Sequence, residues 1–213
     1  MKYFLRLLAV LLAVQSSVSA TSIQPPQLDE LVSQSEWVAV GVVTATRSEW
    51  RENHTGRSIY TVITFVLEDM IVGEAAPELE LVFLGGEVGD DRVVVVGQPR
   101  FAVGDRELLF VANAEARVSP VSRMGYGRFR VLREQAGDHT LRMYREDYSP
   151  LADISDIARE LGHLPAEPEN SRKPHRRVAR PNNPAALSLA QFRKIIVQTA
   201  YATGRSDVNA KLL

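Results

Sequence analysis

The chain has 213 residues, of which 45% are hydrophobic and 24% charged, and it contains no cysteine. This is the composition of an ordinary globular protein with enough apolar mass for a core. The absence of cysteine excludes disulfides, thiolate metal sites, iron–sulfur clusters and cysteine nucleophiles. The four histidines are scattered, so the sequence predicts no metal centre and no cofactor.

The near-neutral formal charge of −1 conceals a split between two parts of the chain. Residues 21–171 carry 14 Arg, no Lys and 25 acidic residues, whereas residues 172–213 carry nine basic residues and one acidic residue. Opposite charges of this kind attract each other or attract different partners. The basic tail therefore docks on its own acidic body or binds an anionic surface outside the cytoplasm. Its candidate anion-binding residues are Arg172, Lys173, Arg176, Arg177 and Arg180.

Residues 1–20 have the pattern of a cleavable export signal and are set apart from the fold. Lys2 and Arg6 form a basic start, Leu7–Val14 is an unbroken apolar run, and the small residue Ala20 precedes the predicted cleavage point. The apolar run is too short to span a bilayer, and no later segment reaches the necessary length. We therefore expect an exported protein, periplasmic or extracellular and soluble, without a transmembrane segment.

Short strands dominate the middle of the chain. Leu28, Leu31 and Val32 indicate a short amphipathic helix before the first strand. Strands are predicted over residues 37–46, 58–72, 78–84, 92–96, 107–112, 128–133 and 140–144, with a polar loop at 47–57 and a glycine-rich turn at 85–91. Closely spaced strands with no helices between them predict a small antiparallel barrel or sandwich. The predicted core includes Tyr60, Val62, Phe65, Leu81, Phe83, Leu109, Phe110 and Phe129.

The chain changes character after residue 148. A helix is predicted over residues 149–162, followed by a Pro- and Arg-rich linker at 163–184 and an amphipathic helix and tail at 185–213. Ser188 and Gln191 form a capping box at the start of the last helix. Its apolar face docks either on its own barrel, which we favour, or on a partner, with Arg193 and Lys194 outward. The candidate partner-binding residues are Leu189, Phe192, Ile195 and Ile196.

No motif that carries chemistry is present. The segment Gly85–Asp91 lacks the Gly-Lys-Ser/Thr sequence of a phosphate loop and the ligand spacing of a calcium loop. Around Arg128 and Arg130, aromatic and basic residues alternate as in an RNA-stacking strand, but an export signal argues against intracellular nucleic acid. We therefore expect both arginines to face solvent on an ordinary strand. No Ser or Thr is paired with a His base in a known pattern, so the sequence predicts a non-enzymatic protein.

A recurrent order of short motifs connects the β-rich part to a known fold. These motifs are Glu36–Val43, Ile59–Phe65, Val72-Gly73, Leu84-Gly85-Gly86 and Gly97–Phe110. Over residues 28–145 the chain resembles small exported bacterial domains similar to the netrin-like, OB-fold module of tissue inhibitors of metalloproteinases. The resemblance implies a closed five-stranded barrel with added helices and an association with secreted matrixin-type proteases. Those inhibitors chelate the catalytic zinc through an N-terminal cysteine, which this chain lacks, so that mechanism is not carried over.

These observations give one division of the chain and two functions. The predicted parts are a signal peptide (1–20), an OB-like closed β-barrel domain (21–148), a helix packed on it (149–162), a linker (163–184) and a C-terminal helix with its tail (185–213). The first function is that of an exported protein-binding module that associates with or regulates a secreted metalloprotease or an envelope protein. The alternative is an adaptor that binds anionic envelope or extracellular surfaces through its basic C-terminal segment.

Overall fold

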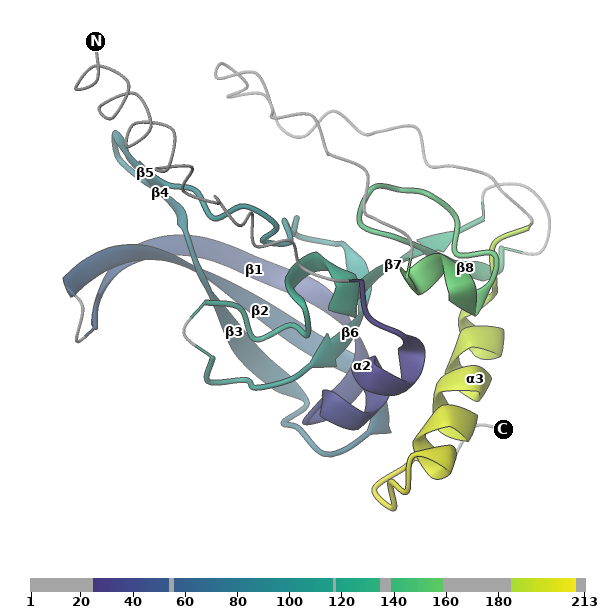
Figure 1. Ribbon diagram of the computed structural model, residues 1–213. Helices are drawn as coiled ribbons and strands as arrows, with labels where there is room; N and C mark the ends of the chain where they lie inside the picture. Colours follow the sequence, from purple (N-terminus) through teal and green to yellow (C-terminus); the bar gives the residue numbers. More distant parts are fainter. Residues whose placement is uncertain (1–24, 54–55, 117, 135–138, 159–184, 210–213) are drawn as a thin grey trace, which may run out of the picture.

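A computed structural model describes residues 25–53, 56–116, 118–134, 139–158 and 185–209, which form a mainly β fold (Figure 1). The strands are β1 (Trp37–Asn53), β2 (Gly56–Val72), β3 (Glu78–Leu84), β4 (Gly86–Val88), β5 (Asp91–Val93), β6 (Arg106–Val111), β7 (Arg128–Arg133) and β8 (Leu141–Tyr144). The helices are α2 (Leu28–Gln34) and α3 (Leu189–Ala202), with short 3-10 helices η1 (Met124–Gly127) and η2 (Ile154–Ala158). The helix predicted at Leu28 and the strand predicted at residues 78–84 are confirmed.

Six strands form one antiparallel sheet in the order β3-β2-β1-β6-β7-β8, and β4 pairs with β5 in a separate hairpin. The sheet is open, because β3 and β8 lie at its two edges and do not pair with each other in the described part of the chain. The predicted closed barrel is therefore wrong, whereas the antiparallel, mainly β class is confirmed. The edge of β8 is covered by the chain itself: Met143 N–H donates to the Leu187 carbonyl and Leu151 N–H donates to the Met143 carbonyl.

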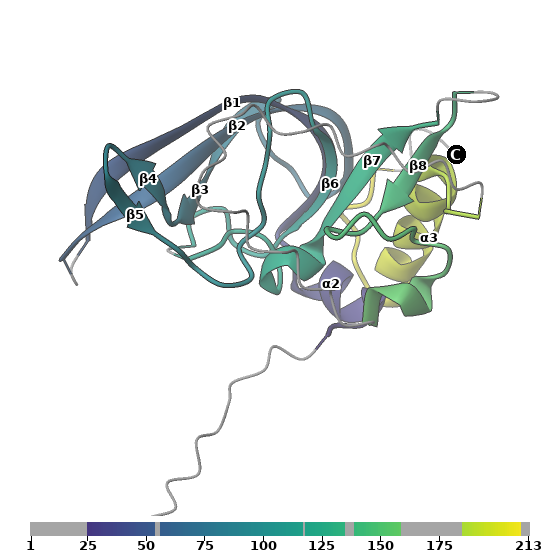
Figure 2. The same cartoon turned by 90° about the horizontal axis from the view of Figure 1, so that it is seen from above.

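Strands β1 and β2 form a long hairpin that curves strongly (Figure 2). Three register shifts along the pair mark β-bulges or irregularities, and such bulges bend a strand and increase its twist. The pairing continues to Asn53 and Gly56, so the loop predicted at residues 47–57 is wrong. Its polar residues are compatible with a strand because they pair on an exposed face; Arg47, for example, binds Glu80 of β3 through two hydrogen bonds of 2.6 and 3.0 Å.

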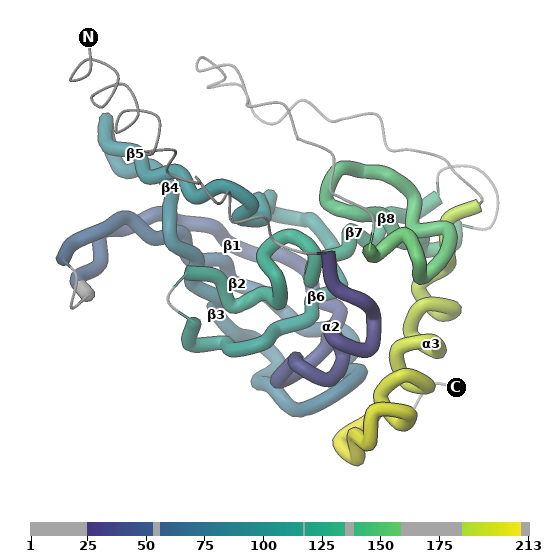
Figure 3. The backbone as a smooth tube through the Cα atoms, viewed as in Figure 1, coloured from purple at the N-terminus to yellow at the C-terminus, as the bar shows by residue number. Residues whose placement is uncertain are grey.

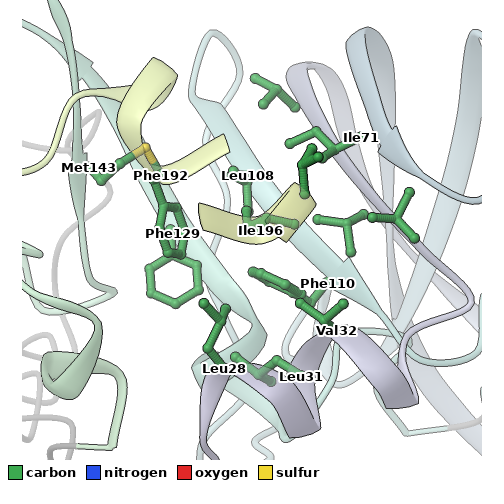
Figure 4. Close-up of a cluster of buried hydrophobic side chains, with 14 of the residues drawn as sticks. Leu28, Leu31, Val32, Ile71, Leu108, Phe110, Phe129, Met143, Phe192 and Ile196 are labelled. Carbon is green, nitrogen blue, oxygen red and sulfur yellow. The ribbon is translucent and has the colours of Figure 1, made fainter. Parts of the chain in front are cut away.

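One face of the sheet packs against both helices. Phe110 of β6, Phe129 of β7 and Phe192 of α3 pack together with ring centroids 5.2–6.5 Å apart. The helix α2 adds Leu28 and Leu31 from below (Figure 4). The capping box predicted from Ser188 and Gln191 is present at the start of α3. Internal docking of this helix, the alternative that we favoured, is therefore confirmed.

The other face of the sheet packs against connecting segments instead of helices. Trp37 and Ala39 of β1 point to this side, while the intervening Val38 points to the helices, as strand alternation requires. Phe101, from the segment between β5 and β6, lies 5.4 Å from Phe65 and 5.2 Å from Phe83 between ring centroids. All eight residues predicted for the core are buried.

Two predicted elements are shorter than expected. The predicted strand over residues 92–96 ends at Val93, and Val94 and Val96 are exposed. The predicted helix over 149–162 is reduced to η2 in the described part, because the chain at Pro150 and Leu151 pairs with β8 instead of starting a helix. The proposed signal peptide (1–20) and the linker (163–184) lie outside the described residues.

Candidate binding surface

A cavity of about 280 Å³ lies between the curved hairpin β1–β2 and the chain that follows β3. One wall is apolar and includes Ile63 and Phe83, and the segment from Val93 to Phe101 forms much of the other wall. Thr46, Thr61 and Gln98 contribute polar groups, as do the charged residues Glu87, Arg92 and Arg100. The lining is divided about evenly between apolar and polar groups, so the cavity can accept an apolar side chain of a partner and also offers hydrogen-bond partners.

Two glycines shape this cavity. Gly85 and Gly86 have φ values of 107° and 139°, which side chains rarely adopt. A Cβ atom on Gly86 would lie 2.5 Å from the Thr61 hydroxyl oxygen and 2.6 Å from that of Ser48. The Thr61 hydroxyl in turn donates to the Gly85 carbonyl at 2.7 Å. The Gly-Gly pair therefore lets the chain after β3 pass in close contact with Ser48 of β1 and Thr61 of β2.

The segment Val93–Val96, called the valine segment below, exposes apolar side chains beside this cavity. The exposed fractions are 62% for Val94 and 90% for Val96. The segment is anchored on both sides: Val93 pairs with Gly86 of β4, and the side-chain amide of Gln98, two residues after Val96, donates to the carbonyls of Leu84 and Val118. Large apolar side chains held outward in this way are typical of an interaction surface. In the sequence, the run of four valines, which Gly97 and Pro99 follow, indicated only a strand.

The residues predicted to bind a partner are used inside the protein. Phe192 and Ile196 are fully buried, and Leu189 and Ile195 pack half-buried against the same core. Arg193, predicted to face solvent, is buried: its side chain donates to Asp69 at 2.8 Å and to the Asn209 carbonyl at 2.7 Å. This face of α3 is therefore not a free surface. The candidate anion-binding residues Arg172, Lys173, Arg176, Arg177 and Arg180 lie outside the described residues.

A buried ionic cluster was missed by the sequence reasoning, which placed Arg128 and Arg130 in solvent. Arg128 is fully buried; it donates two hydrogen bonds to Glu107, at 2.6 and 3.1 Å, and one to Glu146, at 2.5 Å. Arg130 lies 3.4 Å from Asp105 and stacks on Tyr148. The one sequence signal was Glu107, a charge at the head of an apolar strand.

The opposite charges of this cluster stabilise one another inside the protein. Burial favours the neutral form of Arg128, but the charges of Glu107 and Glu146 outweigh it and raise the pKa of Arg128. Burial raises the pKa of Glu107, while Arg128 and Arg130 act in the opposite direction. The side chains of Arg128 and Glu107 are fully buried, so neither faces a ligand.

Comparisons with protein-family models, curated proteins and solved structures find no match for this chain. Among the described residues, no group of three or more His, Asp or Glu side chains is placed to hold a metal ion. No helix in the described part is long and apolar enough to cross a membrane. The function must therefore be inferred from the surface alone.

Proposed function

We propose that the protein is an exported, non-enzymatic module that binds another protein through the valine segment and the adjoining cavity. The observation that carries the proposal is the exposure of Val94 and Val96 between two anchored residues, Val93 and Gln98. A partner that covers these side chains would bury apolar surface at a reduced entropic cost, since the chain is already anchored on both sides of them. Arg92 and Arg100 beside the same cavity supply polar contacts for orientation.

The first partner to test is a secreted metalloprotease, followed by an envelope protein. The resemblance of the sequence to netrin-like domains supports this choice and is part of the same proposal, although the six-stranded sheet is open where those domains have a closed barrel. Because the chain has no cysteine, contact with such a protease would not use the N-terminal cysteine through which the tissue inhibitors chelate zinc. The contact would instead rest on apolar burial around Val96.

Site-specific photo-cross-linking tests this surface. A benzophenone amino acid is placed at Val96 in the exported protein, and at Tyr201 as a control, because Tyr201 is exposed on α3 away from the cavity. We expect one discrete cross-linked partner from Val96 and none from Tyr201, and we expect V94E/V96E to lose binding to the purified partner. Equal cross-linking from both positions, or unchanged affinity of V94E/V96E, would contradict the proposal.

The charge split of the sequence supports the second function, an adaptor for anionic surfaces. Its test uses vesicles with and without anionic lipid and a variant with alanine at Arg172, Lys173, Arg176, Arg177 and Arg180. Binding that requires anionic lipid, weakens with salt and is lost in this variant would favour the adaptor function. Binding that is insensitive to these changes would exclude it.

A further inference from the structure

We propose that the open edge of β3 binds an extended segment of a partner protein by strand addition, and that this segment alternates basic and apolar residues. The proposal goes beyond the valine segment, because it names a second surface and the kind of segment that binds there. The two surfaces adjoin at Leu84, whose carbonyl accepts from the Gln98 side chain. They can nevertheless be tested separately.

The backbone of β3 has an unpaired side. Leu84 directs its N–H to the Val118 carbonyl, on the side away from β2. Since alternate residues of an antiparallel strand direct their N–H and C=O groups the same way, Glu78, Glu80 and Val82 also point away from β2. No backbone partner for these three residues exists within the described residues. They present a row of unpaired N–H and C=O groups, which a further strand can bind.

The two edges of the sheet differ in how far other segments bind their backbone groups. At β8, the Met143 N–H donates to the Leu187 carbonyl, and the Met143 carbonyl accepts from the Leu151 N–H. Among the described residues, backbone groups of the opposite edge are bound only at Leu84, by Val118 and Gln98. The five residues from Glu78 to Val82 therefore form a window of defined length, with Pro77 at one end and Leu84 at the other.

The side chains beside this window specify the occupant. Glu78 and Glu80 are exposed on one face of β3, whereas Leu79 and Leu81 pack toward the apolar core on the other face. Glu80 already binds Arg47, but Glu78 has no ion-pair partner among the described residues. A basic residue directly opposite Glu78 and apolar residues opposite the leucines would complement both faces.

A second copy of the chain is a poor occupant for the same reason. Antiparallel pairing of two β3 strands centred on Glu80 would place the two Glu80 carboxylates directly opposite each other. Like charges in directly opposed positions destabilise strand pairing. The acidic row therefore acts against self-association and favours a basic partner strand.

A synthetic peptide of seven alternating valine and lysine residues, fluorescently labelled, is the probe. Its binding to the full chain is followed by fluorescence anisotropy, and amide hydrogen exchange locates the contact. We expect saturable binding below ~1 mM with new protection at Glu80 and Val82. A peptide of the same sequence with N-methylated backbone amides should not bind, because it cannot extend the sheet.

Two variants identify the interaction. V82P removes an outward N–H without affecting the bonds to β2, and should weaken the peptide about tenfold, the loss expected for one hydrogen bond. E78K should weaken it about fivefold and should bind a valine–glutamate peptide instead. The matched control is E74K, an exposed position just before β3 with the same change of charge.

Three results would overturn the proposal. The first is the absence of saturable binding, or equal binding of the N-methylated peptide. The second is unchanged affinity in both V82P and E78K; E78K alone decides if V82P does not fold. The third is a dimer in analytical ultracentrifugation that V82P dissociates, which would assign the edge to a second copy. V94E/V96E should bind the peptide normally, so failure of the valine segment as a binding surface leaves this result interpretable.

Discussion

Arg128 is a charge placed in the interior of the sheet, and its surroundings explain why it is tolerated there. Glu107 and Glu146 bind its guanidinium, and Phe101 lies over it with 4.2 Å between the guanidinium carbon and the ring centroid. The cluster therefore joins β6, β7 and the turn after β8 to the segment between β5 and β6, which contains Phe101. Removing the arginine would leave two buried carboxylates without a counter-charge.

We predict that R128M destabilises the protein by about 3–5 kcal/mol, the loss typical of breaking a buried ion pair. The measurement is urea unfolding followed by tryptophan fluorescence. R106M is the control: Arg106 pairs with Glu68 near the surface, and such pairs contribute about 1 kcal/mol or less. Similar losses for the two variants would show that the cluster is solvated.

Gly86 is the residue on which the shape of the cavity depends. We predict that G86A destabilises the protein by about 1–3 kcal/mol, because its φ is strained for alanine and the added Cβ meets Thr61 and Ser48. G89A is the matched control, since Gly89 also has a positive φ but no atom within 4 Å of the added Cβ. Chemical denaturation should give G86A a lower free energy of unfolding than G89A. The reverse order would contradict the close approach of Gly86 to Thr61 and Ser48.

At the scale of elements, the last described segment closes the fold. Arg205 donates to the carbonyls of Val32, Ser35 and Glu36, so it caps the end of α2 with a positive charge. Asp207 holds this guanidinium at 2.5 and 2.8 Å, and its carbonyl accepts from Gly73 after β2. One short segment thereby fastens α2 to the end of the β1–β2 hairpin.

This contact predicts a specific pH dependence. The hydrogen bond from Arg205 lowers the pKa of Asp207, so the stabilisation is complete above the ordinary aspartate pKa of about 4 and is lost as pH falls through the lower, folded value. We expect D207N to have a lower melting temperature than the wild type at pH 7, with a difference that shrinks below about pH 4. E74Q serves as the charge control, and a difference for D207N that is independent of pH would contradict this account.

Elements with a strong local signal could be predicted from the sequence, and elements that depend on distant pairing could not. The alternation of Glu78–Leu84 and the capping box of α3 are local, and both were predicted with nearly correct bounds. Whether the sheet closes into a barrel depends on which segments bind its edge strands. Nothing in the sequence around Leu187 indicates that this residue binds β8. The same holds for Arg128, whose burial depends on Glu107 of β6 and on Glu146 of the turn after β8, and for the outward valines, whose composition indicated only a strand.

In the whole molecule, the core packed against the helices and the proposed binding surface lie at opposite ends of the sheet. The helices α2 and α3 cover the end of the sheet near β7 and β8, whereas the β4–β5 hairpin lies at the far end beside the tips of β1 and β2 (Figures 2 and 3). The ionic cluster and Phe101 connect the two ends. A substitution in the valine segment should therefore affect binding without unfolding the protein, whereas one in α3 should affect the whole fold.

The final prediction tests this arrangement through α3. Phe192 is fully buried against Phe110 and Phe129, so F192A should cost about 3–5 kcal/mol and lower the unfolding midpoint of the entire sheet. Y201A, which changes an exposed aromatic residue of the same helix, should leave stability within about 0.5 kcal/mol. Hydrogen exchange should protect the amides of the buried side of α3 as strongly as those of β1, because both belong to one cooperative core. Rapid exchange throughout α3 beside a protected β1 would show that the helix is a separate, weakly attached unit and that its apolar face is available to a partner after all.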